Sequence, residues 1–457
     1  MSKTTIRLIM LFCLLSMSIG LIGCNGPSPS RKVQPPTALS SAQIWIKQHA
    51  IVLKTTDPQA SLDDLLPLKA LIGTASLVGL GEANHGSHEF FTMKHRLLEF
   101  LVEKMGFTMF AMEGSWSAGE LINRYIVQGQ GDAGKVLQLF HFWTWNTQEV
   151  LDLLTWMRAY NADPTHFQKI SFAGFDCQLI EPNTYESVTH YLQSVDPPRV
   201  ATVTALYQGL RPDPAVSMGK YEVAYHQLPQ STLQRYVTQA RQVYDLLTQQ
   251  QAAYVKRSSP RAFALAVQEA RVIMQHAQLF SANSDEAGGF RDKAMAENIT
   301  WLHEQMQNGK KLVLWAHDGH IATGEQPAMG SYLRERYGAN YLAVGMSFYE
   351  GSFNAVGLDD KGQSTPVQPF DVQLADPGSY NDTFGHLGLS LYALDLRHFP
   401  EGAAGQWFQV PHTFAMIGAA YDRRKASYTS LVFLPDYFDV IIHIQKVTAS
   451  HLLPLTS

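Results

Sequence analysis

Residues 76–91 read SLVGLGEANHGSHEFF, and this stretch indicates the fold of the chain. It begins with a short apolar run, residues 76–80, and passes directly into a turn that Gly81 and Gly86 permit. The turn presents a carboxylate, Glu82, and an imidazole, His85, immediately after the run. A short apolar run that ends in ionisable side chains is typical of a buried strand whose carboxyl end carries chemistry.

Similar apolar runs recur along the chain at wide intervals. They cover residues 107–112, 170–175, 312–316, 341–346, 391–394 and 431–433. Continuous apolar runs of this length, with helical segments between them, indicate parallel strands that are buried on both faces. We therefore expect an α/β fold with three layers, α/β/α, around a mostly parallel sheet.

A long stretch of different character separates the run at 170–175 from the run at 312–316. Between about 183 and 290, apolar residues such as Leu233, Tyr236 and Ala240 recur at helical spacing. We expect a helical lobe inserted into the α/β core, where it would form a wall of the substrate cleft. The core and this insertion together would occupy residues 41–457.

Four of the predicted strands lead into ionisable residues. Glu82 and His85 follow the first strand, and Glu113, Asp176 and His317 follow three others. In an open parallel sheet, ligands bind at the carboxyl ends of the strands, so these side chains would meet there. Any one of them could be an ordinary loop residue or a helix N-cap. Four strands ending in the same kind of chemistry favour a single site.

A serine nucleophile is a weaker interpretation. Residues 115–119, SWSAG, approach the nucleophile elbow of serine hydrolases, but their first position is Ser rather than Gly. Ser117 also lies five residues beyond the end of the predicted strand at 107–112. That is too far for a nucleophile held in a strand-to-helix turn.

Two histidine pairs could instead bind a metal ion. His85 and His88, like His317 and His320, have the spacing His-x-x-His, and the carboxylates that follow the strands could add oxygen ligands. This spacing alone is a weak signal, and the chain has no HExxH motif. A metal-dependent hydrolase therefore remains the alternative enzyme, and we assign no metal ligands.

Seven motifs, taken in order, resemble the erythromycin esterase family over residues 60–420. They are GEANHGSHEFF (81–91), MEG (112–114), FWTWNTQEV (142–150), WMRAYN (156–161), GFD (174–176), RDKAMAEN (291–298) and WAHDGH (315–320). The resemblance implies an α/β sheet with an inserted helical region. It also implies hydrolysis of an ester or macrolactone, as in erythromycin-like macrolides, by an activated water with no covalent nucleophile and no cofactor.

The resemblance also implies roles for four residues. His85 matches the general base, Glu82 its carboxylate partner, Glu113 a second essential carboxylate and His317 a second essential histidine. The spacing agrees, because a carboxylate bonded to one imidazole nitrogen fixes the tautomer and leaves the other nitrogen as a base. We expect His317 to stabilise the tetrahedral oxyanion or to protonate the leaving alkoxide.

Further residues are expected at the substrate. They are Lys94, Trp145, Asp176, Arg291 and His320. Lys94 stands where several family members have Arg, and it keeps the charge but loses the fork geometry of a guanidinium. Trp145 would either line an apolar pocket or belong to the core. Arg291 could point into the cleft and bind a carboxylate.

Other polar residues in the motifs have plainer interpretations. Asp292 is expected either to cap a helix or to take part in the site. Asp318 stands where the family commonly has Asn, which would change the local charge. Histidines outside the motifs are expected at the surface or in satisfied core positions; they are His141, His276 and His303.

The N-terminus resembles the export signal of a lipoprotein. Lys3 and Arg7 precede an apolar run at 8–22, and Gly23 and Cys24 complete a lipoprotein box. We expect residues 1–23 to be a signal peptide, Cys24 to carry the lipid, and the Pro/Ser-rich residues 24–40 to be a tether. The chain would then be anchored in the cell envelope, at the outer membrane in a Gram-negative host. The alternative is an ordinary signal peptide with an incidental cysteine.

Composition limits the remaining function classes. The chain has 457 residues, 46% of them hydrophobic and 16% charged, with a net charge of −5. A mildly acidic globular chain lacks the positive charge needed for nucleic acid. Of three cysteines, Cys177 would have no partner once Cys24 is lipidated, so we expect no disulfide. With 19 Tyr and 17 His, a haem-binding envelope lipoprotein of similar fold is the alternative from another class.

Overall fold

The computed structural model describes residues 39–454 except 306–310, 325–326, 375 and 425–427. The expected signal peptide, Cys24 and nearly all of the expected tether lie outside these residues. Among the helices of the described part, none has the length and the apolar character needed to cross a membrane.

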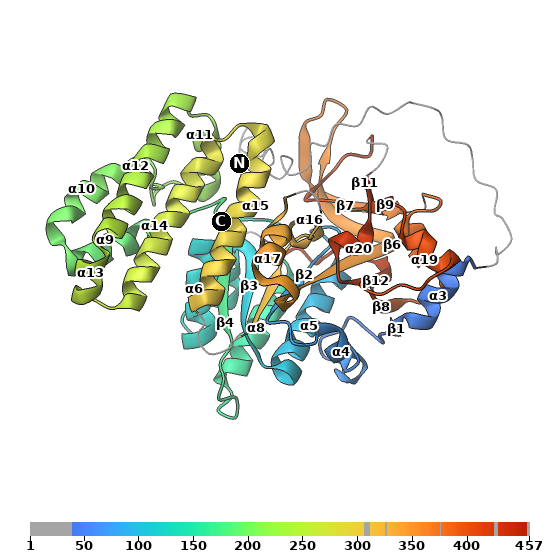
Figure 1. The fold of residues 1–457 in the computed structure, drawn as a ribbon. Coiled ribbons are helices and arrows are strands. Elements are labelled where there is room, and N and C mark those ends of the chain that lie inside the picture. The colour runs from blue at the N-terminus through green and yellow to red at the C-terminus, as the bar shows by residue number, and fades with distance from the viewer. Residues whose placement is uncertain (1–38, 306–310, 325–326, 375, 425–427, 455–457) are drawn as a thin grey trace.

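A ten-stranded sheet forms the centre of the described part (Figure 1). Its order is β1-β8-β12-β6-β2-β5-β3-β4, and β7 and β10 also pair with β6. From β12 to β4 along this order every pair is parallel, whereas β1, β8 and β7 run antiparallel to their neighbours. The strands are β1 Ile51–Val52, β2 Leu77–Leu80, β3 Phe107–Ser115, β4 Ser171–Asp176, β5 Lys311–Trp315, β6 Tyr341–Leu358, β7 Ser364–Gln373, β8 Leu391–Asp395, β10 Ala420–Tyr421 and β12 Val440–Val447.

Five of the predicted strands are parallel as expected, and two are not. The run at 391–394 becomes β8, which is antiparallel to both β12 and β1. The run at 431–433 belongs to β11 (Thr429–Val432), which pairs with β9 (His412–Ala415) in a separate two-stranded antiparallel sheet. Leu431 is 68% exposed there, so the expectation that the run at 431–433 is buried on both faces was wrong. The predicted set also lacks β12, a central strand interrupted by the polar His443.

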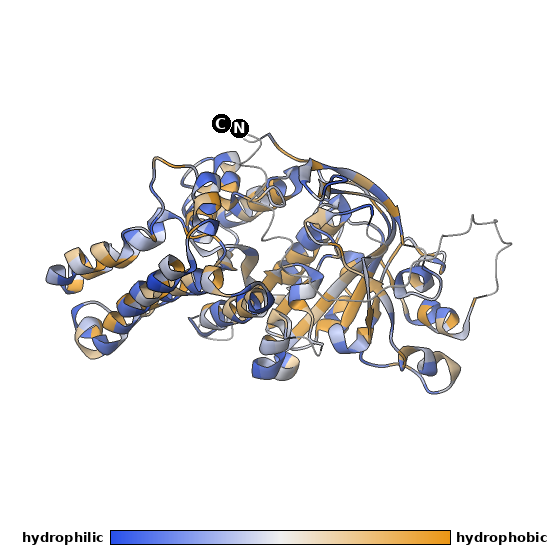
Figure 2. Ribbon diagram, turned by 90° about the horizontal axis from the view of Figure 1, so that it is seen from above, coloured by the Kyte–Doolittle hydropathy of each residue, from blue (hydrophilic) through white to orange (hydrophobic). Residues whose placement is uncertain are grey.

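Helices cover both faces of the sheet, which confirms the three-layer α/β/α architecture. Alternate strand residues enter two different cores: Val78 and Val313 lie in one, Leu77 and Leu312 in the other. Figure 2 shows the hydrophobic strands between helices of mixed hydropathy. The first core includes α5 His88–Met105, α6 Trp116–Gln128 and α8 Gln148–Ala162; the second includes α3 Ser41–His49, α15 Ser284–Gln305 and α17 Met329–Tyr337.

The expected helical lobe is present between β4 and β5 and projects to one side of the sheet (Figure 1). Its helices are α9 Pro182–Val195, α10 Pro197–Tyr207, α11 Met218–His226, α12 Gln230–Gln249, α13 Gln251–Arg257 and α14 Pro260–Ser281. Helix α12 buries Leu233, Ala240 and Val243, the apolar face that its spacing predicts, in the same core as residues of α14. Helix α15 then leads back toward β5.

Short elements complete the fold. They are α4 Leu68–Ile72, α7 Ala133–Leu137, α16 Asp318–Ile321, α18 Tyr380–Gly385, α19 Ala403–Phe408, α20 Leu434–Tyr437 and the 3-10 turns Asp63–Leu65, Gln138–Phe140 and Gly338–Asn340. Strand β6 is much longer than its neighbours and continues into a hairpin with β7, from Glu350 opposite Gln373 to Leu358 opposite Ser364. This hairpin lies at the end of the sheet where the predicted site residues gather.

Candidate active site

Four adjacent strands carry the predicted site residues at their carboxyl ends. The sheet order β2-β5-β3-β4 places Glu82 after β2, His317 after β5, Glu113 near the end of β3 and Asp176 at the end of β4. All four residues are at least 94% buried. The structure therefore brings together residues that are far apart in the sequence, because parallel strands share one carboxyl edge.

The turn after β2 is fixed by close packing and by a side-chain bond. A Cβ at Gly81 would lie 1.9 Å from the Asp318 carboxylate, so only glycine fits there. Asn84 Oδ1 accepts hydrogen bonds from the Gly86 amide at 3.0 Å and from the Ser87 hydroxyl at 2.8 Å. These contacts hold the segment that carries Glu82 and His85.

Glu82, His85 and Lys94, here called the Glu82 group, form a chain of polar contacts. His85 Nδ1 lies 2.7 Å from Glu82 Oε1, and Lys94 Nζ donates to Glu82 Oε2 at 2.8 Å. The carboxylate thus favours the His85 tautomer with its proton on Nδ1, and no described residue bonds to Nε2. The His85 side chain is 12% exposed, whereas Glu82 and Lys94 are fully buried.

Lys94 is a supporting residue in this structure. Its ammonium also donates to the Ala316 carbonyl at 3.0 Å and lies 4.5 Å from the centre of the Trp315 ring. Burial lowers the pKa of Lys94, while the Glu82 carboxylate opposes that shift. Lys94 holds Glu82 in place in this structure, and its expected contact with the substrate stays a prediction.

Arg291 joins carboxylates from two strands. Its Nη2 lies 2.6 Å from Asp176 Oδ2 and 2.7 Å from Glu113 Oε1, and its Nε lies 3.2 Å from both Asp176 oxygens. Burial acts to raise the pKa of Glu113, but His320 and Arg291 outweigh it and hold that pKa well below its usual value. Arg291 binds carboxylates as expected, but they belong to the protein.

His320 and Asp292 complete this Arg291 cluster, which we define as Glu113, Asp176, Arg291, Asp292 and His320. His320 Nδ1 lies 2.7 Å from Asp292 Oδ1, and its Nε2 lies 3.3 Å from Glu113 and 3.0 Å from Arg291 Nη1. Burial acts to lower the pKa of His320, yet Asp292 and Glu113 raise it to about 10. His320 is therefore cationic at neutral pH.

Asp292 is not a helix N-cap, because α15 begins at Ser284 and Asp292 lies within it. Its carboxylate accepts from the Met329 amide at 2.9 Å as well as from His320. The sequence interpretation as a cap was wrong, since the helix begins earlier than its motif suggested. Asp176, Arg291 and His320 all have protein partners, and their expected contact with the substrate stays a prediction.

His317 is held by both of its ring nitrogens. Nδ1 accepts from the Gly319 amide at 3.1 Å, and Nε2 donates to the Ile417 carbonyl at 3.1 Å. Burial lowers the pKa of His317 far below its usual value, and the nearby His85 and His320 lower it further. Its ring centre lies 4.9 Å from that of His85. Both ring nitrogens are thus bonded in this structure, and the expected role of His317 as oxyanion stabiliser or proton donor stays a prediction.

Asp318 follows His317 and is fully buried. Its Oδ1 accepts from the Met346 amide at 3.1 Å, and its Oδ2 has no partner among the described residues. Burial raises the pKa of Asp318 well above its usual value, which favours the neutral, protonated form. This direction reduces the expected change in local charge relative to Asn.

Trp145, expected either at the substrate or in the core, and Ser117, the rejected nucleophile, are both buried. Trp145 is 2% exposed and meets the His85 ring edge to face, with 5.6 Å between the ring centres. Strand β3 extends to Ser115, so Ser117 lies two residues beyond it rather than five. Its hydroxyl lies 2.7 Å from the Thr184 hydroxyl and accepts from the Glu181 amide at 3.1 Å. Neither of these partners is a histidine that could activate the hydroxyl. Ser117 is therefore still not favoured as a nucleophile, but the reason is its bonding and not its distance from the strand.

The two His-x-x-His pairs do not converge on shared ligand positions. His85 turns to Glu82, whereas His88 Nδ1 lies 2.6 Å from Glu149. His317 bonds to backbone groups, whereas His320 bonds to Asp292. The metal interpretation of these pairs at the strand ends is therefore not supported by their geometry. Cys177 is a free, buried thiol.

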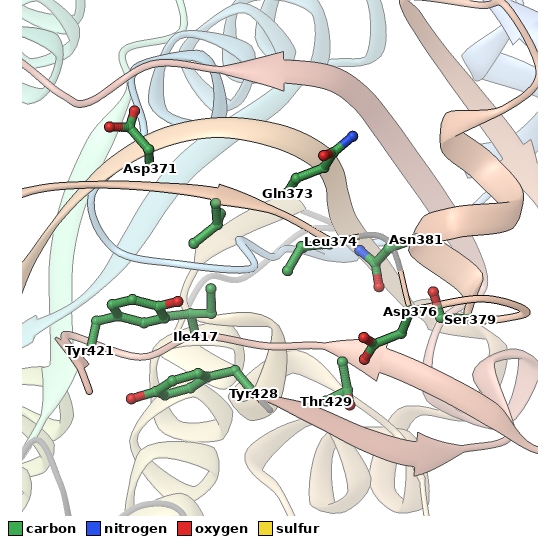
Figure 3. Close-up of a pocket in the computed structure, with 11 residues that line it drawn as sticks. Asp371, Gln373, Leu374, Asp376, Ser379, Asn381, Ile417, Tyr421, Tyr428 and Thr429 are labelled. Atoms are coloured by element: carbon green, nitrogen blue, oxygen red, sulfur yellow. The ribbon is translucent and has the colours of Figure 1, made fainter. Parts of the chain in front are cut away.

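A cavity of about 320 Å³ adjoins this site through Ile417 (Figure 3). The Ile417 carbonyl accepts from His317, its amide donates to the Ala83 carbonyl at 2.6 Å, and its side chain lines the cavity. Tyr421 and Tyr428 stack with ring centres 4.8 Å apart on one side of the cavity. Sequence reasoning missed Ile417, because a backbone carbonyl leaves no signal in residue type.

Comparisons with known proteins place the chain among relatives of similar length. A crystal structure of a Bacillus cereus protein is 32% identical, with a TM-score of 0.80, covering 90% of this chain and 98% of that one. A structure described as a succinoglycan biosynthesis protein is 30% identical, with a TM-score of 0.75 and the same coverage. Erythromycin esterase type II of Escherichia coli is 26% identical over 383 residues, covering 78% of this chain and 89% of the relative.

The family comparison agrees with the motifs. The erythromycin esterase family model matches residues 102–447. This range contains Glu113, Asp176, Arg291 and the histidines that follow β5. The chain belongs to the erythromycin esterase family.

Proposed function

We propose that this protein hydrolyses a carboxylic ester by general-base activation of water at His85. One observation carries the proposal: Glu82 holds His85 through Nδ1, and Nε2 of a partly exposed ring has no partner among the described residues. An imidazole held in this way can act as a general base toward water. Family membership supports the reaction class, because other family members are named as esterases.

The proposed reaction has two steps. His85 Nε2 takes a proton from water while the water oxygen attacks the carbonyl carbon of the ester, giving a tetrahedral oxyanion. The C–O bond to the alcohol then breaks, and the imidazolium of His85 returns the proton to the leaving alkoxide. Glu82 stabilises the imidazolium between these steps, and a general base of this kind typically contributes ~10²–10⁴-fold to the rate.

The Arg291 cluster lies at the same edge of the sheet, where Glu113 pairs with both Arg291 and His320. Its two cations face three carboxylates, so we propose that the cluster holds the ends of β3 and β4 in place and supplies no net positive charge to the oxyanion. In this proposal His317 packs against His85 and orients it, while His85 itself acts as the proton donor.

The substrate class we propose is a macrolactone of the erythromycin type. The name of the Escherichia coli relative supports this class, and so does the family description. The decisive experiment incubates the purified chain with a set of macrolides and follows the mass by liquid chromatography and mass spectrometry. We expect addition of one water to a macrolide, and none with the His85→Ala variant.

A second arm tests the mechanism apart from the substrate. A single turnover in H₂¹⁸O should place the label in the released carboxylate and none on the protein. Hydrolysis of simple esters without macrolide turnover would reject the substrate class but keep the mechanism. Full activity in His85→Ala would reject the assignment of the base.

We also propose that a lipid on Cys24 anchors the protein in the cell envelope. The lipoprotein box at residues 21–24 supports this, and the Pro/Ser-rich residues after it have the composition of a tether. Metabolic labelling with an alkyne fatty acid should mark the wild-type chain and leave Cys24→Ala unmarked. Recovery of unlabelled wild-type chain in the soluble fraction would contradict the anchor.

A further inference from the structure

A segment that follows β12 lies across the turn bearing His85. Residues 448–453, the C-terminal strap, follow β12 and pair with two loops. The Ser450 amide donates to the Gly86 carbonyl at 2.8 Å, and the Gln148 amide donates to the His451 carbonyl at 2.9 Å. The strap thus joins the N-terminal ends of α5 and α8.

Two imidazoles converge on one carboxylate under this strap. His88 Nδ1 lies 2.6 Å and His451 Nδ1 2.7 Å from the same oxygen, Glu149 Oε1. One potential ligand atom from each of the three residues lies within 4.8 Å of the others. The Glu149 side chain is 3% exposed, while His88 is 33% and His451 69% exposed. The carboxylate is therefore fixed, and the imidazoles close it off from solvent.

We propose that His88, Glu149 and His451 bind a divalent transition-metal ion of the zinc class. Two imidazoles and one carboxylate are a ligand set that Zn²⁺ uses in proteins, with a fourth position left to water. Mg²⁺ and Ca²⁺ prefer sets made of oxygen ligands, so this set disfavours them. The site differs from the metal interpretation of the His-x-x-His pairs, since it uses one histidine of the first pair and a residue near the C-terminus.

The present distances are those of hydrogen bonds, and a metal ion needs a modest expansion. With bonds of about 2.0 Å to zinc, neighbouring ligand atoms of a tetrahedral site lie about 3.3 Å apart. Each imidazole must then move by roughly 0.6 Å from the carboxylate oxygen, which the exposed His451 can do at little cost. The metal would replace the two protons that the imidazoles now direct at Glu149.

The electrostatic surroundings favour a cation on balance. Glu89 and Asp152 act on His88 in addition to Glu149. The N-terminal ends of α5 and α8 oppose a cation, but each helix dipole carries only about half a unit charge. Three carboxylates outweigh the two helix ends.

A bound ion would fasten the strap over the His85 turn. Ligands from α5, from α8 and from residue 451 would then be joined by one centre, so separation of the strap would require loss of the metal. A metal that binds the folded chain alone stabilises it in proportion to its occupancy. The inference does not depend on the proposed hydrolysis.

The test uses the purified chain freed of any affinity tag. Equilibrium dialysis against Zn²⁺, read by elemental mass spectrometry, should show one site that His451→Ala and His88→Asn each weaken by at least about 100-fold. His386→Ala is the matched control, because His386 contacts one carboxylate, Asp382, at 3.3 Å and is 48% exposed. This control should bind Zn²⁺ as the wild type does.

Two further readouts distinguish coordination from loose binding. Co²⁺ at the site should give the intense visible absorption of a tetrahedral centre, and Zn²⁺ should raise the Tm of the wild type and of His386→Ala. Neither effect should occur in His451→Ala. The proposal is overturned if Zn²⁺ binding is not saturable, if it is equal in all variants, or if Mg²⁺ competes for the site at similar concentration.

Discussion

The Glu82 group and the Arg291 cluster are built from the same three kinds of side chain, namely carboxylate, imidazole and cation. They differ in what remains unbonded. In the Glu82 group, one ring nitrogen of His85 has no partner within the described part of the chain, and the side chain is partly exposed. In the Arg291 cluster, both nitrogens of His320 contact carboxylates, and Nε and Nη2 of Arg291 are bonded to Asp176 and Glu113. Residue type alone therefore does not distinguish a reacting group from a supporting one.

The largest expected effect is a loss of unfolding free energy, which should be greater for a substitution in the Arg291 cluster than for one in the Glu82 group. Arg291→Met would leave Glu113 and Asp176 buried without their cation, and breaking a buried pair in this way costs about 3–5 kcal/mol. His85→Ala removes one hydrogen bond from a carboxylate that Lys94 still holds, at a cost of about 1 kcal/mol. Unfolding in urea, followed by circular dichroism, measures both free energies.

Arg336→Met is the control for this comparison. Arg336 pairs with Glu304 at the surface, where 53% of the Arg336 side chain is exposed. Loss of such a pair costs within about 1 kcal/mol. If Arg291→Met costs no more than Arg336→Met, the Arg291 cluster does not support the fold, and the contrast between the two regions fails.

The unfolding free energy measured as a function of pH tests the contribution of His320 to the Arg291 cluster. Asp292 and Glu113 overcome the effect of burial and raise the pKa of His320 to about 10, above the value of about 6.5 in the unfolded chain. The resulting stability is complete below pH 6.5 and is lost as pH rises toward 10. We expect the difference in unfolding free energy between wild type and His320→Gln to shrink over this range. A difference that stays constant from pH 6 to 10 would show that His320 is neutral.

The sequence predicts which residues meet at the site better than it predicts their hydrogen-bond partners. Glu82 and His85 share one turn, so their contact follows from local spacing, and the parallel strands explain why Glu113 and Asp176 join them. The partner of His317 is the Ile417 carbonyl, 100 residues away, which no residue type reveals. The burial of Lys94, on helix α5, likewise depends on Trp315 at the end of β5 and on Ala316 after it.

The errors in the fold have a similar cause. A short apolar run contains no information on strand direction, so β8 and β11 were expected to be parallel like the other predicted strands, whereas both are antiparallel to the strands that they pair with. Asp292 was a candidate helix cap because Asp is a common N-cap residue, but it lies inside a helix that begins at Ser284. Charge and hydrophobicity locate elements, whereas direction and boundaries depend on tertiary contacts.

A smaller effect is expected from the turn that carries the Glu82 group. In Gly81→Ala the new Cβ would lie 1.9 Å from Asp318 Oδ1 and 3.0 Å from Ile321. Because Asp318 is fully buried, the turn must shift, at a cost of about 1–3 kcal/mol. The shift should lower kcat, since it displaces His85. Gly289→Ala is the control: its Cβ meets no atom within 4 Å, so helix propensity predicts equal or greater stability.

The smallest effect is expected at Ser117. This substitution tests whether the reaction uses a covalent serine nucleophile instead of water activated by His85. Ser117→Ala removes a buried hydroxyl that bonds to Thr184 and to the Glu181 amide, so stability should fall by about 1–2 kcal/mol. The kcat should stay within about twofold of wild type, because a hydroxyl without a histidine partner cannot serve as an activated nucleophile. Ester turnover at a temperature where both proteins are folded measures this. A loss of kcat as large as that of His85→Ala would instead indicate an acyl-serine intermediate. The unbonded nitrogen of His85 would then not identify the Glu82 group as the catalytic one.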